Sequence, residues 1–145
     1  MPVAQINLLK GHSPDALRQI LAGVSEVMSR ILKAPKDRLI VRIVESDPAL
    51  WAIGGIPASE ALASGRREEL EIPFVQMVLM EGRPKEQFHA LIETITEIVA
   101  RCTGIAPSRV RIHIALAHPD NWGIGGIPAS IARAKELEAR ARAET

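Results

Sequence analysis

The chain has 145 residues, of which 47% are hydrophobic and 24% are charged, a composition typical of one compact globular domain or two very small ones. Eighteen basic and seventeen acidic side chains leave a net charge of +1, and only 3% of the residues are aromatic. Binding to nucleic acid is therefore not expected, because a basic surface and stacking aromatics are both missing. The single cysteine, Cys102, excludes an internal disulfide, and no apolar run approaches the length of a membrane span. We expect a cytoplasmic enzyme or binding protein that uses no membrane.

The first predicted element is a half-buried strand from Val3 to Leu9, where Ala, Ile and Leu alternate with Val, Gln and Asn. Pro2 opens this strand, a position that tolerates proline because the strand ladder needs no N–H there. If Met1 is removed, Pro2 carries a free secondary amine anchored at the end of a sheet. Burial or neighbouring cations lower the pKa of such an amine, which makes it a candidate general base at neutral pH. The alternative is that Met-Pro is an ordinary start with no chemical meaning.

A helix and a second strand are predicted next. Residues 13–15 (Ser-Pro-Asp) have the residue types of a helix start, and apolar residues then recur at steps of three and four up to Leu32. Residues 34–35 (Ala-Pro) end the helix. Alternation predicts a strand from Leu39 to Glu45, and residues 51–57 read as a short strand or hairpin with a glycine turn.

The second half of the chain repeats the first at a constant offset of 71 positions. Pro73 stands 71 positions after Pro2, and Ile-Gly-Gly-Ile-Pro-Ala-Ser follows a tryptophan in each half, at 53–59 and at 124–130. An ungapped repeat of this kind is a specific sign of a duplicated β-α-β unit. We expect one unit at residues 1–59 and the other at 72–130, joined by a polar linker at 60–71. Residues 131–145 are expected to form a solvated helix or a frayed tail.

The duplication predicts an α/β (α+β) fold with a four-stranded sheet and two helices on one face. Strands that flank a helix of this length should be parallel. One sheet face then has no helix over it, so several chains are needed to cover it.

Three segments carry a resemblance to a known family: Pro-Val-Ala-Gln-Ile-Asn-Leu-Leu-Lys-Gly at 2–11, Ser-Glu-Val-Met-Ser-Arg at 25–30, and the repeated Ile-Gly-Gly-Ile-Pro-Ala-Ser. Together they resemble the tautomerase superfamily, and within it the 4-oxalocrotonate (2-hydroxymuconate) tautomerases. The resemblance covers the chain twice and implies two short subunits fused head to tail. Because single-unit members form hexamers, it implies a homotrimer. It also implies an amino-terminal proline as general base or acid, two arginines that hold a dicarboxylate enol, a pocket aromatic, and no metal or organic cofactor.

Carried over by position, the family pattern divides unequally between the halves. Pro2 is the implied catalytic residue, whereas Pro73 is an internal amide without basicity. The first arginine position holds His12 in the first half and Arg83 in the second. Arg83 precedes a helix, where a carboxylate ligand would gain from the guanidinium and from the helix end, and a solvated arginine is the alternative. His12 could donate to a substrate oxygen, although a surface loop histidine is the favoured interpretation.

The second arginine position holds Ile40 in the first half and Arg111 in the second. Arg111 lies between apolar residues and so faces the sheet side without helices, where it needs a partner or a wet cavity. Arg42 is either a further substrate contact or half of an inter-subunit ion pair. Tryptophan replaces the family's aromatic residue, and one of Trp51 and Trp122 is expected to wall the pocket; packing at subunit contacts is the alternative for both. The implied substrate-binding residues are Arg83, Arg111, Trp122, Arg42 and His12.

These residues imply an isomerase in which Pro2 moves a proton along a conjugated 2-hydroxy dienoate while arginines hold its carboxylates. The expected partner is a small unsaturated oxo or hydroxy carboxylate or dicarboxylate. Hydration, as in the 3-haloacrylate dehalogenases of the same superfamily, is a lesser alternative because those enzymes use a tyrosine and this chain has none. Decarboxylation of a 3-oxo acid has weaker support. A non-catalytic oligomeric relic is the third alternative, since His12 and Ile40 depart from the pattern.

Overall fold

The computed structural model describes residues 2–143, and each half contains one β-α-β unit. The first unit consists of β1 (Val3–Leu9), α1 (Pro14–Leu32), the 3-10 turn η1 (Lys36–Arg38) and β2 (Ile40–Ser46). The second consists of β5 (Phe74–Met80), α4 (Lys85–Thr103), the 3-10 turn η3 (Pro107–Arg109) and β6 (Arg111–Ala117).

Local signals define the ends of the first helix. The Ser13 hydroxyl accepts a hydrogen bond from the N–H of Ala16, and Pro14 occupies the first turn. The helix ends at Lys33, which has a left-handed backbone with φ of 53°. The equivalent residue after α4 is Gly104, which adopts φ of 76° without steric cost. Lys33 therefore carries a backbone strain that Gly104 avoids.

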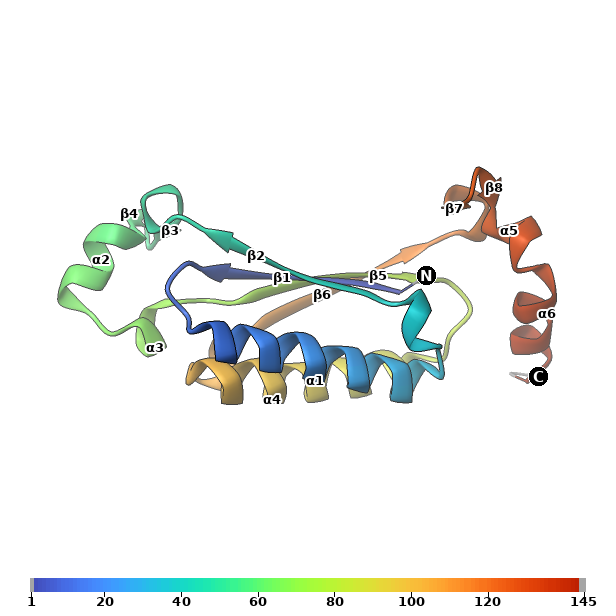
Figure 1. The fold of residues 1–145 in the computed structure, drawn as a ribbon, viewed down its shortest axis with the longest axis horizontal. Coiled ribbons are helices and arrows are strands. Elements are labelled where there is room, and N and C mark those ends of the chain that lie inside the picture. The colour runs from blue at the N-terminus through green and yellow to red at the C-terminus, as the bar shows by residue number, and fades with distance from the viewer. Residues whose placement is uncertain (1, 144–145) are drawn as a thin grey trace.

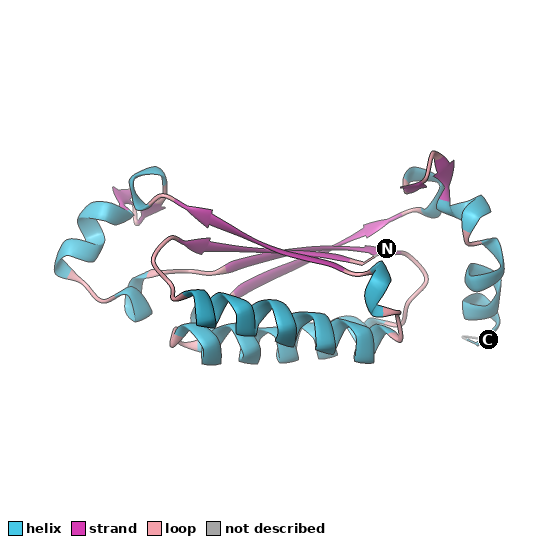
Figure 2. Cartoon of the chain, in the orientation of Figure 1, coloured by secondary structure: helices cyan, strands magenta, loops and turns pink. Residues whose placement is uncertain are grey.

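The two units join into one four-stranded sheet in the order β2-β1-β5-β6. Strands within a unit are parallel, whereas β1 and β5 are antiparallel, with Gln5 opposite Gln76. Because Gln5 and Gln76 are equivalent positions of the repeat, an approximate two-fold axis passes between them. Both long helices lie on the same face of the sheet (Figure 1), and Figure 2 shows the two-layer arrangement. The predicted fold class is confirmed.

The core lies between the sheet and the two helices. Alternate residues of β1 and β5 are buried, as are the apolar stripes of α1 and α4. Each fully buried Leu or Ile contributes roughly 1.5–3 kcal/mol. The helices approach each other closely at Gly23, where an added Cβ would lie 3.1 Å from Cγ2 of Ile98. A larger residue at Gly23 would push α1 away from α4.

Two arms extend from opposite ends of the sheet (Figure 1). The first arm follows β2 and consists of η2 (Pro48–Leu50), β3 (Ala52–Ile53), β4 (Ile56–Pro57), α2 (Ala58–Ser64) and α3 (Arg67–Leu70). The second follows β6 and consists of η4 (Pro119–Asn121), β7 (Gly123–Ile124), β8 (Ile127–Pro128), α5 (Ala129–Ala132) and α6 (Ala134–Ala143). The expected linker at 60–71 is thus largely helical. The expected tail contains α6, and its last two positions lie outside the described residues.

The sheet face opposite the helices is bare in the single chain. Apolar side chains there are exposed, with 47% for Ile40 and 38% for Val44. Between them lies a polar row in which Gln5 hydrogen-bonds to Asn7 and accepts a hydrogen bond from Arg42. Within residues 2–143, no helix has the length and apolarity needed to cross a membrane.

Candidate active site

The repeat places two equivalent prolines at opposite ends of the sheet. The carbonyl of Pro2 accepts a hydrogen bond of 3.1 Å from the N–H of Ile40, and the carbonyl of Pro73 accepts one of 2.9 Å from Arg111. Since β1 and β5 are antiparallel, Pro2 lies beside the end of β5 and Pro73 lies beside the end of β1. Each end of the sheet therefore combines the proline of one half with the strand-to-helix loop of the other half.

Pro2 is buried and lines a cavity of about 80 Å³, several times the space that one water molecule needs. The lining includes apolar groups such as Met80 and Leu137, and one carboxylate, Glu136. Five further lining side chains are basic: Lys33, Arg38, Arg83, Arg133 and Arg140. A small cavity with this excess of positive charge is suited to an anion.

Arg83 is a half-buried arginine of this cavity. Its Nη1 donates to the carbonyl oxygen of Leu32 at 2.8 Å, at the last turn of α1. Its Nε is buried and, among the described residues, has no hydrogen-bond partner. Burial, followed by the nearby charge of Arg140, lowers the pKa of Arg83 to about 10. Arg83 stays charged at neutral pH, and a bound carboxylate would satisfy the free Nε and compensate both cations.

The C-terminal helix α6 supplies one wall of the cavity. Glu136 on this helix accepts two hydrogen bonds from Arg38 Nη1, at 3.0 and 2.9 Å. This ion pair attaches α6 to the turn that follows α1. It also means that Glu136, the single carboxylate of the cavity lining, is already bound by Arg38. The segment expected to be solvated or frayed thus contributes Arg133, Leu137 and Arg140 to the cavity.

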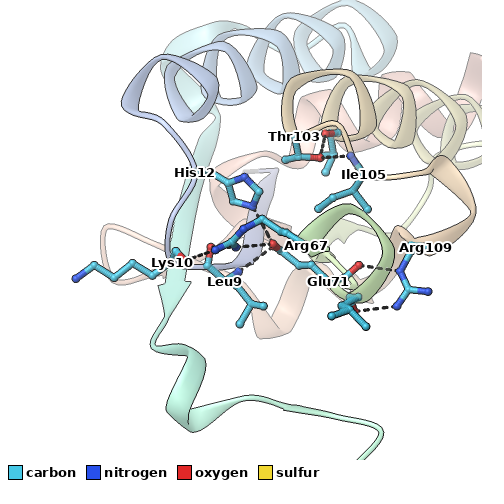
Figure 3. Close-up of polar contacts among 10 residues, drawn as sticks. Leu9, Lys10, His12, Arg67, Glu71, Thr103, Ile105 and Arg109 are labelled. Atoms are coloured by element: carbon cyan, nitrogen blue, oxygen red, sulfur yellow. Dashed lines mark hydrogen bonds and ion pairs between the residues drawn. The ribbon is translucent and has the colours of Figure 1, made fainter. Parts of the chain in front are cut away.

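The opposite end of the sheet contains a carboxylate in place of an open cavity (Figure 3). Glu71 is fully buried, and its Oε2 accepts the N–H of Leu9 at 2.9 Å. His12 Nε2 lies 2.9 Å from Oε1, and Arg67 Nη1 donates to the same oxygen at 2.9 Å. Burial by itself raises the pKa of the Glu71 carboxyl, but the hydrogen bonds from His12, Leu9 and Arg67 together hold it below its ordinary value. Glu71 is therefore ionised at neutral pH.

Of the residues that the sequence predicts for the site, the structure brings Pro2 and Arg83 into one cavity. Arg111 lies at the other end of the sheet, beside Pro73. Trp122 lies on the arm after β6, which continues from the end of the sheet near Arg83 (Figure 1), but it is not among the cavity residues.

Two further predicted residues have partners within the chain. Arg42 lies on the bare sheet face and donates to Gln5. The favoured interpretation of His12 as a surface loop residue is wrong, because its side chain is only 6% exposed and contacts Glu71. The buried carboxylate, 59 positions later in the chain, accounts for the difference.

Sequence reasoning missed the basic side chains Lys33, Arg38, Arg133 and Arg140, and it missed Glu71. A position-by-position comparison of the two halves contains a signal for Lys33, which stands where the second half has a helix-ending glycine. A non-glycine residue with a left-handed backbone beside a cavity is a candidate functional position. The residues of α6 and the linker have no comparable signal in the sequence.

Both halves of the chain match a known protein family. The family model described as "Tautomerase: Tautomerase enzyme" matches residues 2–60 and 73–130. A 2-hydroxymuconate tautomerase of Pseudomonas putida is 43% identical over 60 residues, which cover 41% of this chain and 95% of the relative. Among solved structures, a fused 4-OT wild-type asymmetric trimer matches with a TM-score of 0.76 and 22% identity, covering 92% of this chain and 98% of that chain.

A second solved structure, Pt0534 inactivated by 2-oxo-3-pentynoate, matches with a TM-score of 0.73 and 25% identity, over 90% of this chain and 98% of that chain. The two matched segments leave out the linker and the C-terminal helices. With the cavity at Pro2 and a family match in both halves, the chain belongs to the tautomerase family of enzymes, in a form that carries two tautomerase units in tandem.

Proposed function

We propose that the chain interconverts the enol and keto forms of a small unsaturated 2-hydroxy carboxylate, with Pro2 as the general base and acid. The observation that supports this most strongly is the position of Pro2 in a cavity lined by five basic side chains. The name of the Pseudomonas putida relative supports 2-hydroxymuconate, a dicarboxylate, as the first substrate to test.

The chemistry needs a neutral secondary amine at Pro2, and therefore a chain from which Met1 has been removed. Met1 lies outside the described residues, so its removal is part of the proposal. Neighbouring cations lower the pKa of an amine and so favour its neutral form near pH 7. The Pro2 nitrogen takes the proton of the 2-hydroxyl group and returns it to a carbon further along the conjugated chain. The proton is conserved in this sequence, and no oxidant, reductant or cofactor takes part.

Arg83 is proposed to hold one carboxylate of the substrate. Its buried Nε is a donor without a partner among the described residues, and Arg140 places a second positive charge nearby. The held carboxylate anchors one end of the substrate in the Pro2 cavity and so contributes binding energy to the bound substrate and to the transition state alike. Trp122 is proposed as an aromatic wall at this end of the sheet.

Arg111 is proposed to reach the site from a neighbouring chain of a homotrimer. Within one chain, Arg111 lies at the end of the sheet away from Pro2. The bare sheet face with exposed Ile40 and Val44 requires a cover, and the fused 4-OT that this chain resembles in fold is a trimer. In this arrangement Arg42 lies on the buried face and contacts the neighbouring chain or the substrate.

Mixed trimers test the shared site. Chains with Arg83→Ala lack the cavity arginine but keep Arg111, whereas chains with Arg111→Ala keep Pro2 and Arg83. If Arg111 acts between chains, refolding the two weakened variants together restores one complete site in each mixed trimer, and each pure variant keeps its reduced kcat/KM. A mixture that is no more active than the pure variants, while a tag on one variant co-purifies the other, contradicts the shared site. A monomer in sedimentation at micromolar concentration contradicts the trimer itself.

The tautomerase activity is tested directly by the absorbance change of 2-hydroxymuconate. Intact mass must first show that Met1 is absent. Pro2→Ala should lower turnover strongly, whereas the matched control Pro73→Ala should leave it within about twofold, because an internal amide nitrogen has no basic lone pair. Full activity in Pro2→Ala would show that the secondary amine of proline is not required, since an alanine freed of Met1 still carries a primary α-amine.

One observation supports hydration as a second candidate. Glu136 is a carboxylate in the lining of the Pro2 cavity, where it could activate a water molecule. Both of its carboxylate oxygens accept hydrogen bonds from Arg38, which leaves them less available to a water molecule and favours tautomerisation. Chloride release from 3-chloroacrylate that disappears in Glu136→Gln would favour hydration.

A further inference from the structure

The Pro73 end of the sheet has the same parts as the Pro2 cavity. At the constant offset of 71, four positions of the second end correspond to four positions of the first: Pro73 to Pro2, Leu9 to Met80, His12 to Arg83 and Arg109 to Arg38. The first end is open as a cavity, whereas the second end is closed by the linker that follows α2.

The closing group is the carboxylate of Glu71, and its oxygens contact Leu9 and His12 of the first half and Arg67 of the linker (Figure 3). The pairing of β1 with β5 ends where Asn7 faces Phe74, so the N–H of Leu9 has no strand partner beyond this point. Glu71 Oε2 accepts that N–H at 2.9 Å, and His12 lies 2.9 Å from Oε1. An unpaired strand N–H with an adjacent basic side chain is a favourable place for any carboxylate.

Arginine side chains also bind the backbone of the linker, in addition to the Glu71 carboxylate. Arg109 donates to the carbonyl oxygens of Glu71 at 3.0 Å and of Leu70 at 2.8 Å. Arg67 donates to the carbonyl of Lys10 at 2.9 Å, in addition to Glu71. The equivalent Arg38 at the first end binds a side-chain carboxylate instead.

A second difference reduces the space at the Pro73 end. Ile105 is 1% exposed there, and the equivalent residue at the Pro2 end is Ala34. Ile105 therefore fills volume that is left open beside Pro2. The carboxylate of Glu71 occupies the polar part of the pocket, and Ile105 occupies apolar volume beside it.

We propose that Glu71 is an intramolecular ligand of a second carboxylate-binding pocket, formed by the Leu9 N–H, His12 and Arg67. The attached carboxylate keeps this pocket closed, so that of the two equivalent ends of the sheet the Pro2 end is the open one. When the Glu71 side chain is removed, the pocket accepts a small free carboxylate such as acetate. An ordinary structural ion pair would leave no such pocket. The proposal concerns binding alone and does not depend on the activity proposed for Pro2.

Thermal unfolding in acetate tests this inference. Glu71→Ala should be less stable than the wild type in chloride, and acetate at constant ionic strength should raise its Tm in a saturable manner. At ten times its Kd, a ligand that binds only the folded state raises the folded-to-unfolded ratio about elevenfold. The matched control Glu69→Ala, an exposed position on α3, should respond to acetate as the wild type does.

A second variant separates the pocket from general anion effects. In Glu71→Gln the amide still fills the space, so acetate should have no more effect than on the wild type. Equal stabilisation of Glu71→Gln and Glu71→Ala would overturn the proposal, as would an acetate response of Glu71→Ala no larger than that of the wild type. If Glu71→Ala does not fold in chloride, refolding in acetate takes the place of the melting curve. Recovery of folded protein then supports the pocket, and no recovery contradicts it.

Discussion

Replacing Arg83 by alanine removes the buried cation of the Pro2 cavity. The side chain makes a hydrogen bond of 2.8 Å to the carbonyl of Leu32 and leaves its Nε free of any described partner. Loss of the bond to Leu32 costs about 0.5–1.5 kcal/mol of folding stability. Removal of the charge that faces Arg140 offsets part of this cost. We expect Arg83→Ala to stay folded, with a stability change of about 1 kcal/mol or less.

The effect on activity should be much larger than the effect on folding. A charge-assisted hydrogen bond contributes about 1.5–3 kcal/mol, so its loss lowers kcat/KM about ten- to a hundredfold. The carboxylate that Arg83 holds keeps its charge during proton transfer, and the contact is therefore equally strong in the bound substrate and in the transition state. The loss should appear mainly in KM. Arg83→Lys should recover part of it, because lysine keeps the charge but cannot bind a carboxylate in a bidentate manner.

Steady-state kinetics on 2-hydroxymuconate, followed by absorbance, measures both parameters. Arg30→Ala is the matched control, because Arg30 is an exposed arginine at the end of α1, away from the cavity residues. A kcat/KM of Arg83→Ala within twofold of the control would refute the assignment of Arg83. A fall confined to kcat would show that Arg83 acts on the reacting atoms and does not hold a distant carboxylate.

Three further outcomes are expected. Protein that retains Met1, identified by intact mass, should be inactive because an acylated Pro2 nitrogen has no basic lone pair; full turnover by such protein would exclude Pro2. An acetylenic 2-oxo acid, the class of compound that inactivates the similar structure Pt0534, should label one nitrogen per chain on the peptide that begins at Pro2, and more slowly as the pH falls. Inactivation with that peptide unmodified would place the nucleophile elsewhere. Glu71→Gln should be less stable than the wild type at neutral pH, because a carboxyl with a lowered pKa stabilises the fold when it is ionised and faces His12 and Arg67. The difference in unfolding free energy, measured by urea titration, should disappear as the pH falls below about 4.5. A difference that persists at low pH would mean that the ionisation of Glu71 does not stabilise the fold.

The local pattern of apolar and polar residues was sufficient to predict most of the fold. Strand alternation from Val3 to Leu9 places alternate side chains in the core, and the helical stripe places α1 over them, since these periods follow from backbone geometry alone. The predicted second strand, 39–45, is shifted by one residue from β2, Ile40–Ser46, because the 3-10 turn η1 uses the residues before it. The 71-residue repeat then predicts the second unit from the first.

The sequence by itself determined the duplicated unit, the sheet with one bare face, and Pro2 and Arg83 as candidate site residues. Only the tertiary structure decided that these two line one cavity, because that depends on the antiparallel pairing of β1 with β5. Backbone hydrogen bonds form this strand pairing, and they are the same for every residue type. No sequence motif therefore predicts which two strands pair. The same holds for α6 and for Glu71, whose surroundings come from segments far away in the chain. A glutamate in a polar linker has the pattern of a solvated residue until the fold brings an unpaired strand N–H and a histidine to its carboxylate.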